Sequence, residues 1–419
     1  MMDEFKKVSV IGLGYIGLPT AAMFASRKIE VVGVDVSAAV VDTINRGEIH
    51  IVEPDLDMVV HAAVNEGYLR ATTTPEPADA FLIAVPTPFT GDNHDPDLSF
   101  VKAAAQAIAP VLAPGCLVIL ESTCPVGATE AVSQWLAEAR PDLSFPQNEG
   151  PASDIRVAHC PERVLPGRVM QELVSNDRII GGMTARCSEA ATQLYKAFVT
   201  GKCVVSSGPR AAEMAKLTEN SFRDVNIAFA NELSMICGAL DMDVWEVIAM
   251  ANRHPRVNVL QPGPGVGGHC IAVDPWFIVA SAPEHSQLIR AARGVNDRKP
   301  DWVLDRVKGA VGTYLTENPD KTARDVTIAL YGLSFKPDID DLRESPALEI
   351  AIQTAAVHPG TVVIVEPHIT TLPDGLATAT LATETQVNAD VHVMLVDHQI
   401  FKETARPDGT IVDTRGVWD

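Results

Sequence analysis

The sequence predicts an α/β fold in three parts, in which two α/β domains flank a mainly helical domain. Three observations support this prediction. Short apolar runs rich in β-branched residues alternate with helical patterns in the first part, a long stretch poor in glycine and proline follows, and strand-like runs return towards residue 419. We expect the domains to span residues 1–208, 209–315 and 316–419.

The first part is expected to form a doubly wound parallel sheet, because its strands and helices alternate along the chain. The predicted strands are the apolar runs at residues 8–11, 31–34, 80–85 and 117–121. Helical patterns lie between them, for example at residues 18–26 and 100–108.

The second part has a helical pattern from residue 209 to about residue 308. Residues 213–240 contain no proline, and no glycine before Gly238, so one helix of unusual length is expected there. Strand-like runs at 326–331, 361–365 and 391–396 then predict a second, smaller α/β domain.

Composition restricts the class of protein. The chain is 47% hydrophobic, which is enough to bury sizeable cores, but no run approaches the roughly 20 apolar residues that span a bilayer. A net charge of −21 would repel nucleic-acid phosphates, so we expect neither a nucleic acid nor a membrane as partner. The seven cysteines form no CxxC pair, which favours a cytoplasmic protein without a metal site.

A glycine-rich turn follows the first predicted strand. Gly12, Gly14 and Gly17 form a GxGxxG run that opens a helix, as in dinucleotide-binding domains of the Rossmann type. Asp35 ends the next strand near the spacing of about 20 residues expected for the acid that binds the adenosine ribose. A carboxylate there repels a 2′-phosphate, so the sequence predicts NAD rather than NADP.

A second glycine-rich stretch ends in a cysteine. The run GPGVGGHC at 263–270 places four glycines before Cys270, and Asp274 follows four residues later. Most single cysteines are small buried packing residues, but a glycine-rich loop is a poor place for packing. We therefore interpret Cys270 as a nucleophile.

Two groups of polar residues could serve the same site. Lys216, Asn220 and Arg223 are spaced to share one face of the long helix, although a solvated polar face explains the spacing equally well. Lys336 and Arg343 lie on a loop of the third part, where they suit a phosphate clamp or simply aid solubility.

Over almost its whole length the chain resembles the UDP-glucose/GDP-mannose dehydrogenase family. The matching runs are GLGYIG (12–17), VPTP (85–88), ESTCPVG (121–127), CPER (160–163), KLTEN (216–220), GPGVGGHCIAVD (263–274) and GLSFKPDIDDLR (332–343). The resemblance implies a Rossmann-type NAD-binding domain, a central helical dimerisation domain and a Rossmann-like UDP-binding domain.

Within the family, three runs are similar to the branch that acts on UDP-N-acetyl-D-mannosamine. They are ENSFRDVN (219–226), NRHPRVN (252–258) and IAVDPWF (271–277). UDP-glucose dehydrogenases typically have Leu-Pro-Lys-Asp after the cysteine, where this chain has Ile271-Ala272-Val273-Asp274. The resemblance implies a four-electron oxidation at C6 of the sugar, with two NADH formed, for cell-surface polysaccharide synthesis.

The resemblance also implies a role for each matching residue. Cys270 would be the nucleophile that carries a thiohemiacetal and then a thioester, Lys216 the general acid/base, and Asn220 its partner at the oxyanion. Thr123, Glu162 and Asp274 match the positions around the hydrolytic water, and which carboxylate acts as base stays open.

The binding residues follow in the same way. The NAD contacts implied are Gly12, Gly14, Tyr15, Ile16, Gly17, Asp35, Thr87, Thr123 and Arg343. Those to the UDP-sugar are Arg163, Val164, Lys216, Asn220, Arg223, His254, Gly267 and Lys336. Arg256 matches an arginine that reaches the partner's site, so a homodimer or higher homo-oligomer is expected.

Three alternatives stay open at this stage. The same chemistry on UDP-glucose, GDP-mannose or UDP-N-acetylgalactosamine is the closest. A single-hydride dehydrogenase of the 6-phosphogluconate type would need no cysteine and would give one NADH per product. A silent NAD-binding protein is disfavoured, because Lys216, Asn220 and Cys270 occur together.

Overall fold

The computed structural model describes residues 5–91, 93–268 and 270–418. The chain divides into two compact units, which are described separately below. The N-terminal unit comprises Met1–Glu219 with Trp276–Ala282, and the C-terminal unit comprises Asn220–Pro275 with Pro283–Asp419.

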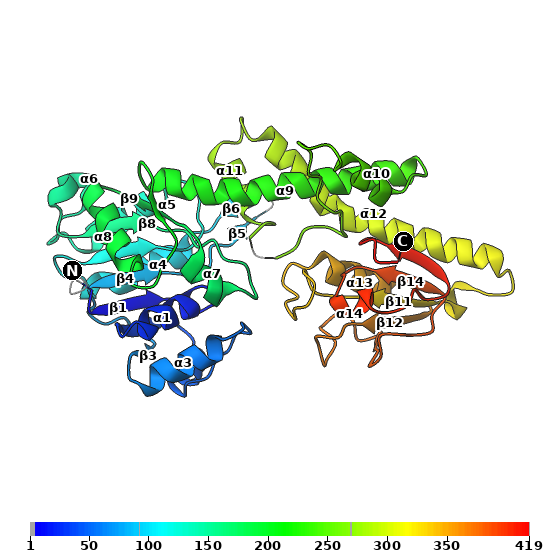
Figure 1. Cartoon of the computed structure of the whole chain (residues 1–419), viewed down its shortest axis with the longest axis horizontal. Helices are drawn as coiled ribbons and strands as arrows, with labels where there is room; N and C mark the ends of the chain where they lie inside the picture. Colours follow the sequence, from blue (N-terminus) through cyan, green and yellow to red (C-terminus); the bar gives the residue numbers. More distant parts are fainter. Residues whose placement is uncertain (1–4, 92, 269, 419) are drawn as a thin grey trace. The chain divides into compact units, whose positions relative to one another are not determined.

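The N-terminal unit is built on one large sheet (Figure 1). Among the described residues this sheet has eight strands, in the order β10-β9-β8-β7-β4-β1-β2-β3. Their bounds are β1 Lys7–Ile11, β2 Glu30–Val34, β3 Leu69–Thr72, β4 Ala80–Ile83, β7 Leu117–Leu120, β8 Arg156–His159, β9 Arg178–Gly182 and β10 Cys203–Val205. A separate antiparallel pair joins β5 (Phe89–Thr90) to β6 (Asp95–Pro96).

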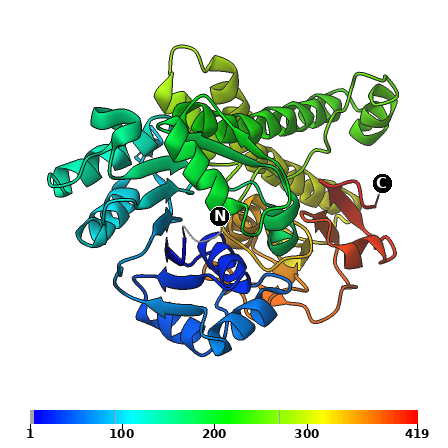
Figure 2. The same cartoon turned by 60° about the vertical axis from the view of Figure 1, so that its left-hand side comes forward.

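Helices cover both faces of this sheet, as the blue to green elements in Figure 2 show from a second direction. One core contains α1 (Gly17–Ser26), α3 (Leu56–Asn65), α7 (Val169–Ser175) and α8 (Ala185–Tyr195). The other contains α4 (Ser99–Ile108) and α5 (Ala128–Ala139). Burial on both faces explains why the central strands are continuous apolar runs. The short helices α2 (Ala38–Asn45) and α6 (Pro146–Glu149) also belong to this unit.

The strand order creates a topological switch point of the kind typical for open α/β sheets. β1 pairs with β2 on one side and β4 on the other, so the chain reverses its direction of winding between β1 and β4. Ligands bind outside the carboxyl ends of the strands at such a switch point. The segments that begin at Gly12, Ala84 and Glu121 follow the carboxyl ends of β1, β4 and β7.

Two helices of 31 residues follow. They are α9 (Pro209–Ala239) and α12 (Gln287–Glu317), with α10 (Val244–Ala251) and α11 (Asp274–Ser281) between them in the chain. The division between the two units falls within α9.

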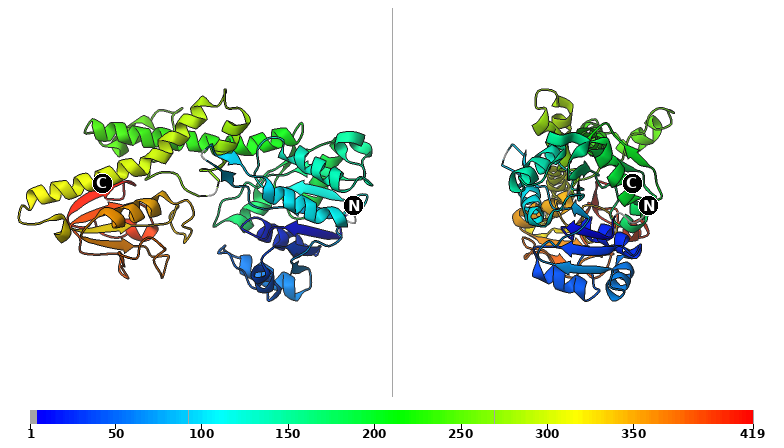
Figure 3. Two further views of the ribbon diagram at one scale, coloured as in Figure 1. Left: turned by 180° about the vertical axis from the view of Figure 1, so that it is seen from behind. Right: turned by 90° about the vertical axis from the view of Figure 1, so that its left-hand side faces the viewer.

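The C-terminal unit contains a five-stranded parallel sheet, seen from behind in Figure 3. Its order is β13 (Thr380–Leu381), β12 (Thr361–Val365), β11 (Thr327–Tyr331), β14 (Val391–Met394) and β15 (Thr410–Asp413). One face packs on α12 and α13 (Pro346–Val357), and the other packs on α14 (Gln399–Lys402) and Trp418.

The predicted strands and the long helix are confirmed, with small shifts at their ends. One expectation was wrong: the first sheet is not parallel throughout, because β9 runs antiparallel to β8 and β10 follows the direction of β9. An apolar run predicts a buried strand but not its direction. Among the described helices, none combines the length and apolar character needed to cross a membrane.

Candidate active site

The turn after β1 leaves room for a ligand. Gly12 has φ +90°, and a Cβ there would lie 2.6 Å from the carbonyl oxygen of Ala84. A Cβ on Gly17 would lie 1.8 Å from the carbonyl oxygen of Gly12, so these two glycines are required by the fold itself. A Cβ on Gly14 meets nothing within 4 Å among the described residues. Gly14 therefore lies at an open position, which fits the approach of a pyrophosphate to the backbone.

Asp35 is held in place at the end of β2. One carboxylate oxygen accepts from the backbone N–H of Leu13 at 3.0 Å, and the other accepts from that of Ser37 at 2.9 Å. The carboxylate thus lies beside the glycine-rich turn, as an acid that recognises an adenosine ribose must. These residues fit NAD, with Asp35 placed to hold the ribose and the turn to hold the diphosphate.

Other residues of the expected NAD set lie around the same strand ends. Thr87 follows β4, and its hydroxyl donates to the backbone carbonyl of Thr123 at 2.6 Å, which ties together the segments after β4 and β7. Tyr15 and Ile16 are both half-buried at the start of α1.

The loop before Cys270 lies against the segment of the C-terminal unit that runs from Phe335 to Pro346. A Cβ on Gly267 would lie 2.3 Å from the carbonyl oxygen of Glu344, and one on Gly268 would lie 2.8 Å from the ring of Phe335. The loop therefore needs these glycines, because it packs directly on the segment that contains Lys336 and Arg343. Within that segment, Arg343 forms an ion pair with Asp341 at 2.6 Å.

Cys270 itself has an exposed thiol. Five of the other cysteines are buried and Cys203 is half-buried. The exposure contradicts the alternative that Cys270 is a packing residue. Its backbone carbonyl accepts from the N–H groups of Val273 and Asp274, at 3.1 and 2.9 Å, in the turn that begins α11.

Asn220 and Asp274 meet in the C-terminal unit, where the Asn220 amide donates to the Asp274 carboxylate. Both side chains are buried, with exposed fractions of 6% and 3%. The structure thus brings Asn220 to the start of α11, four residues after Cys270. Lys216 is buried one turn earlier on α9, in the N-terminal unit. Arg223 is exposed, so the expected shared face divides into a buried and an exposed part.

Glu162 and Arg163 follow β8 in the N-terminal unit. The backbone N–H of Arg163 donates to Glu162 at 2.6 Å, and Arg178 donates to the other oxygen of Glu162. The Arg163 guanidinium pairs with Glu219 at 2.6 Å. Val164 is half-buried and packs on the core beneath.

His254 and Arg256 lie together in the exposed segment after α10. The Nδ1 atom of His254 accepts from the backbone N–H of Arg256 at 3.3 Å. Both side chains are exposed, and they lie apart in the sequence from the other expected substrate contacts.

Sequence reasoning missed a buried charge cluster beside Glu162. Glu121 and Arg178 lie 3.6 Å apart, and the Tyr195 hydroxyl donates to Glu121 at 3.1 Å. Burial raises the pKa of Glu121 to about 7, with Arg178 opposing the rise and Glu162 adding to it. The signal available in the sequence was a charged residue at the end of one apolar strand run and at the start of another.

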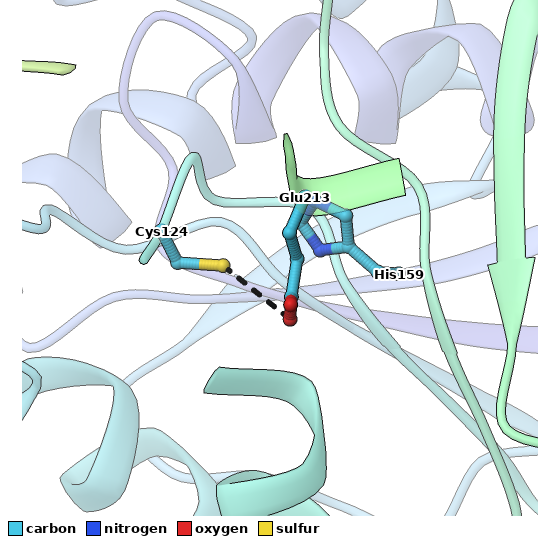
Figure 4. A group of neighbouring side chains, drawn as sticks. All are labelled: Cys124, His159 and Glu213. Atoms are coloured by element: carbon cyan, nitrogen blue, oxygen red, sulfur yellow. Dashed lines mark hydrogen bonds between the residues drawn. The ribbon is translucent and has the colours of Figure 1, made fainter. Parts of the chain in front are cut away.

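A second buried group, drawn in Figure 4, contains Cys124, His159 and Glu213. Glu213, on α9, accepts from the N–H groups of Gly127 and Thr129 and from the Thr129 hydroxyl, at 2.7, 2.8 and 2.6 Å. It therefore caps the start of α5. Burial lowers the pKa of His159 to about 3, which keeps the ring neutral beside this carboxylate.

Family models match almost the whole chain. They are the NAD binding domain of the UDP-glucose/GDP-mannose dehydrogenase family at residues 6–199, its central domain at 210–298 and its UDP binding domain at 329–419.

Individual relatives are similar over their full length. The chain is 64% identical to the UDP-N-acetyl-D-mannosamine dehydrogenase of Yersinia pestis, covering 99% of this chain and 100% of that protein. It is also 64% identical to the NDP-N-acetyl-D-galactosaminuronic acid dehydrogenase of Ralstonia nicotianae, covering 99% and 97%. The solved structure of a UDP-D-ManNAc dehydrogenase from Pyrococcus horikoshii matches with a TM-score of 0.85 at 37% identity, covering 99% and 96% of the two chains.

Proposed function

The chain belongs to the UDP-glucose/GDP-mannose dehydrogenase family, and from this premise we propose that it oxidises UDP-N-acetyl-D-mannosamine at C6 to UDP-N-acetyl-D-mannosaminuronate. Each turnover removes four electrons and forms two NADH. The product is the sugar acid of a cell-surface polysaccharide pathway. Relatives named for this activity, 62–64% identical to the chain, support the substrate.

The observation that carries the proposal is the surroundings of Cys270. The thiol is exposed at the end of a glycine-rich loop, and Asn220 and Asp274 are joined by a hydrogen bond in the same unit. A nucleophilic thiol followed by a buried carboxylate and amide suits a reaction with a covalent acyl intermediate.

The first oxidation needs a base at the C6 hydroxyl, and we assign this role to Lys216. Lys216 takes the hydroxyl proton as the hydride leaves C6, and an aldehyde results. Bound NAD supplies the hydride acceptor for both oxidations. The Cys270 thiolate then adds to the aldehyde carbon, and Lys216 and Asn220 stabilise the oxyanion of the thiohemiacetal.

Loss of a second hydride leaves a thioester on Cys270. Water hydrolyses this thioester, and we assign Glu162 as the base that takes the water proton, with Thr123 and Asp274 placed around the water. Glu162 suits the role because its carboxylate is fixed by two donors. Cys270 leaves as a thiolate and is ready for the next sugar.

The remaining assignments concern binding. We propose that the NAD-binding, central and UDP-binding segments are residues 1–208, 209–315 and 316–419. The proposed NAD contacts are Gly12, Gly14, Tyr15, Ile16, Gly17, Asp35, Thr87, Thr123 and Arg343. The proposed UDP-sugar contacts are Arg163, Val164, Lys216, Asn220, Arg223, His254, Gly267 and Lys336.

A homodimer is part of the proposal. The side chains of Phe222, Phe229 and Ile236 are exposed by 68%, 56% and 47%, and they recur every seven residues along α9. Such a stripe suits a helix that packs against its copy. Arg256, exposed beyond α10, would complete the neighbouring site. No disulfide joins any two of the seven cysteines, each of which lies within the described ranges, and this fits a cytoplasmic location.

A second substrate is supported by the Ralstonia nicotianae relative, whose name refers to an N-acetyl-D-galactosaminuronic acid. The two sugars differ in configuration at C2 and C4, so one panel separates them. NADH formation is measured with UDP-N-acetyl-D-mannosamine, UDP-N-acetyl-D-galactosamine, UDP-glucose and GDP-mannose. We expect the highest kcat/KM for the first, with two NADH per sugar. A higher kcat/KM for another sugar would identify that sugar as the substrate instead. Formation of one NADH per sugar would contradict the four-electron oxidation.

A further inference from the structure

Four buried side chains form a group around the proposed base in the N-terminal unit, and three of them have no role in the mechanism above. The members are Glu121, Glu162, Arg178 and Tyr195, each at most 7% exposed. Glu121 follows β7, Glu162 follows β8, Arg178 begins β9 and Tyr195 ends α8. Residues up to 74 positions apart in sequence are thus brought together at one point.

Glu162 is held through both carboxylate oxygens. Arg178 Nη1 donates to Oε2, and the backbone N–H of Arg163 donates to Oε1 at 2.6 Å. Each carboxylate oxygen retains a second lone pair that can accept a proton from water. These two contacts therefore fix the direction of the base without blocking it.

Arg178 is in turn held by the other two members. Its guanidinium lies over the Tyr195 ring, 4.4 Å from the centroid, and its Nη1 lies 3.6 Å from Glu121 Oε1. The Tyr195 hydroxyl donates to the same Glu121 oxygen at 3.1 Å. Oε2 of Glu121 has no hydrogen-bond partner among the residues that the structure describes.

The two carboxylates share one guanidinium in a region without solvent, so both cannot ionise at equal cost. Burial raises the pKa of Glu121 to about 7. The charged and titratable groups that face Glu121 are Arg178, Glu162, Tyr195 and Cys160. Near neutral pH Glu121 is therefore protonated for much of the time, so the Glu162 carboxylate is the main anion paired with Arg178.

We propose that Arg178 is a positioning residue for Glu162 in thioester hydrolysis, with Glu121 and Tyr195 holding the guanidinium in place. The inference rests on the proposed function, because it takes Glu162 as the base. In this step the water oxygen bonds to the acyl carbon, the carbon–sulfur bond breaks and the Cys270 thiolate leaves. The water proton passes to Glu162, and Arg178 keeps that carboxylate anionic and oriented until then.

The test follows hydrolysis separately from the oxidations in Arg178→Met. Both hydrides leave before hydrolysis, so a variant that is slow in hydrolysis gives a rapid burst of two NADH per site and then a slow steady state. We expect the steady-state rate to fall about 10-fold or more. Mass spectrometry of quenched enzyme should show the sugar acyl group on Cys270. Arg178→Lys keeps the charge but not the planar guanidinium that lies over Tyr195, so its steady-state rate should lie between those of the wild type and Arg178→Met.

Glu121→Gln provides a second measurement, because the amide imitates the protonated acid. The wild-type hydrolysis rate should change with pH near 7 as Glu121 ionises, and Glu121→Gln should remove that change while keeping the rate at pH 7. If Arg178→Met does not fold, Arg178→Lys and Glu121→Gln decide the matter. Hydrolysis rates and pH profiles equal to wild type in both would overturn the inference.

Two reference variants separate the possible failures. Arg186→Met removes an exposed arginine of the same unit and should leave the burst and the steady state unchanged. Glu162→Gln should accumulate the acyl enzyme. If Glu162→Gln accumulates the acyl enzyme but Arg178→Met is slow without a burst or an adduct, the positioning role of Arg178 is wrong. If Glu162→Gln turns over at the wild-type rate without an adduct, the assignment of the base in the proposed function is wrong instead.

Discussion

Cys270 is exposed at the end of a closely packed loop. Gly267 and Gly268 allow the backbone of this loop to touch Phe335 and the carbonyl of Glu344. A buried cysteine would be inert, whereas an accessible thiol can attack an aldehyde. The exposure of Cys270 therefore fits a reactive residue better than a packing residue.

Replacing Cys270 should separate binding from chemistry. A serine hydroxyl has a far higher pKa than a thiol and cannot ionise usefully at neutral pH, so Cys270→Ser should lower turnover by several orders of magnitude. Binding of NAD and the UDP-sugar should change little. Rapid quench with labelled sugar should detect a covalent adduct in the wild-type enzyme. Cys203→Ser, at a half-buried thiol, is the control, and a Cys270→Ala enzyme with wild-type acid production would rule out the thioester.

Asp35 should decide which cofactor is used. Its carboxylate is fixed by Leu13 and Ser37 at the end of β2, where it would meet a 2′-phosphate. We expect Asp35→Asn to reduce the ratio of kcat/KM for NAD to that for NADP about 10- to 100-fold, because a charge-assisted hydrogen bond is lost and a repulsion is removed. Asp42→Asn, on the exposed face of α2, should leave the ratio unchanged. Equal use of both cofactors by the wild-type enzyme would contradict the role of Asp35.

At the scale of elements, Glu213 connects α9 to α5. Helix α5 begins with Gly127 as N-cap, which has no side chain to satisfy the first N–H groups. Glu213 supplies the missing acceptor, and its negative charge also interacts favourably with the helix N-terminus. The start of the long helix is thus fixed to the N-terminal unit by one carboxylate.

Removing this carboxylate should destabilise the N-terminal unit. Glu213→Ala leaves three donors from Gly127 and Thr129 without their acceptor, and the two from Thr129 are buried, so we expect a loss of about 2–5 kcal/mol in the free energy of unfolding. Glu213→Gln, which keeps one carbonyl acceptor, should lose less. Urea unfolding followed by circular dichroism measures both. Glu138→Ala, at an exposed position of α5, should stay within about 0.5 kcal/mol of wild type, and a similar value for Glu213→Ala would refute the capping role.

The elements were predictable from the sequence to different degrees. Strands such as β1 and β12 are short apolar runs between polar segments, so the hydropathy of the sequence alone predicted their positions. The direction of β9 was not predictable, because hydropathy carries no information about it. The partners of Glu213, Glu121 and Arg178 were missed for a related reason. They are 84, 74 and 16 residues away in the chain, and only the folded arrangement of strand ends brings them together.

At the scale of the whole molecule, net charge and exposed apolar surface have opposite effects on the association of copies of the chain. The net charge of −21 keeps copies of the chain apart at long range, and salt screens this repulsion. The exposed stripe of Phe222, Phe229 and Ile236 favours association once copies touch. A dimer held through α9 should therefore be stronger in salt than in dilute buffer.

Phe229 lies in the middle of this stripe, so it is the position at which to test assembly. Phe229→Glu places a charge opposite its own copy in a symmetric interface, and we expect the sedimentation coefficient to fall from that of a dimer to that of a monomer. Activity should fall with it, because in the proposed dimer Arg256 would no longer reach the neighbouring site, while NAD binding should persist. Phe100→Glu, at a residue 49% exposed on α4, should stay dimeric and active. A fully active wild-type monomer would show that the site needs no partner.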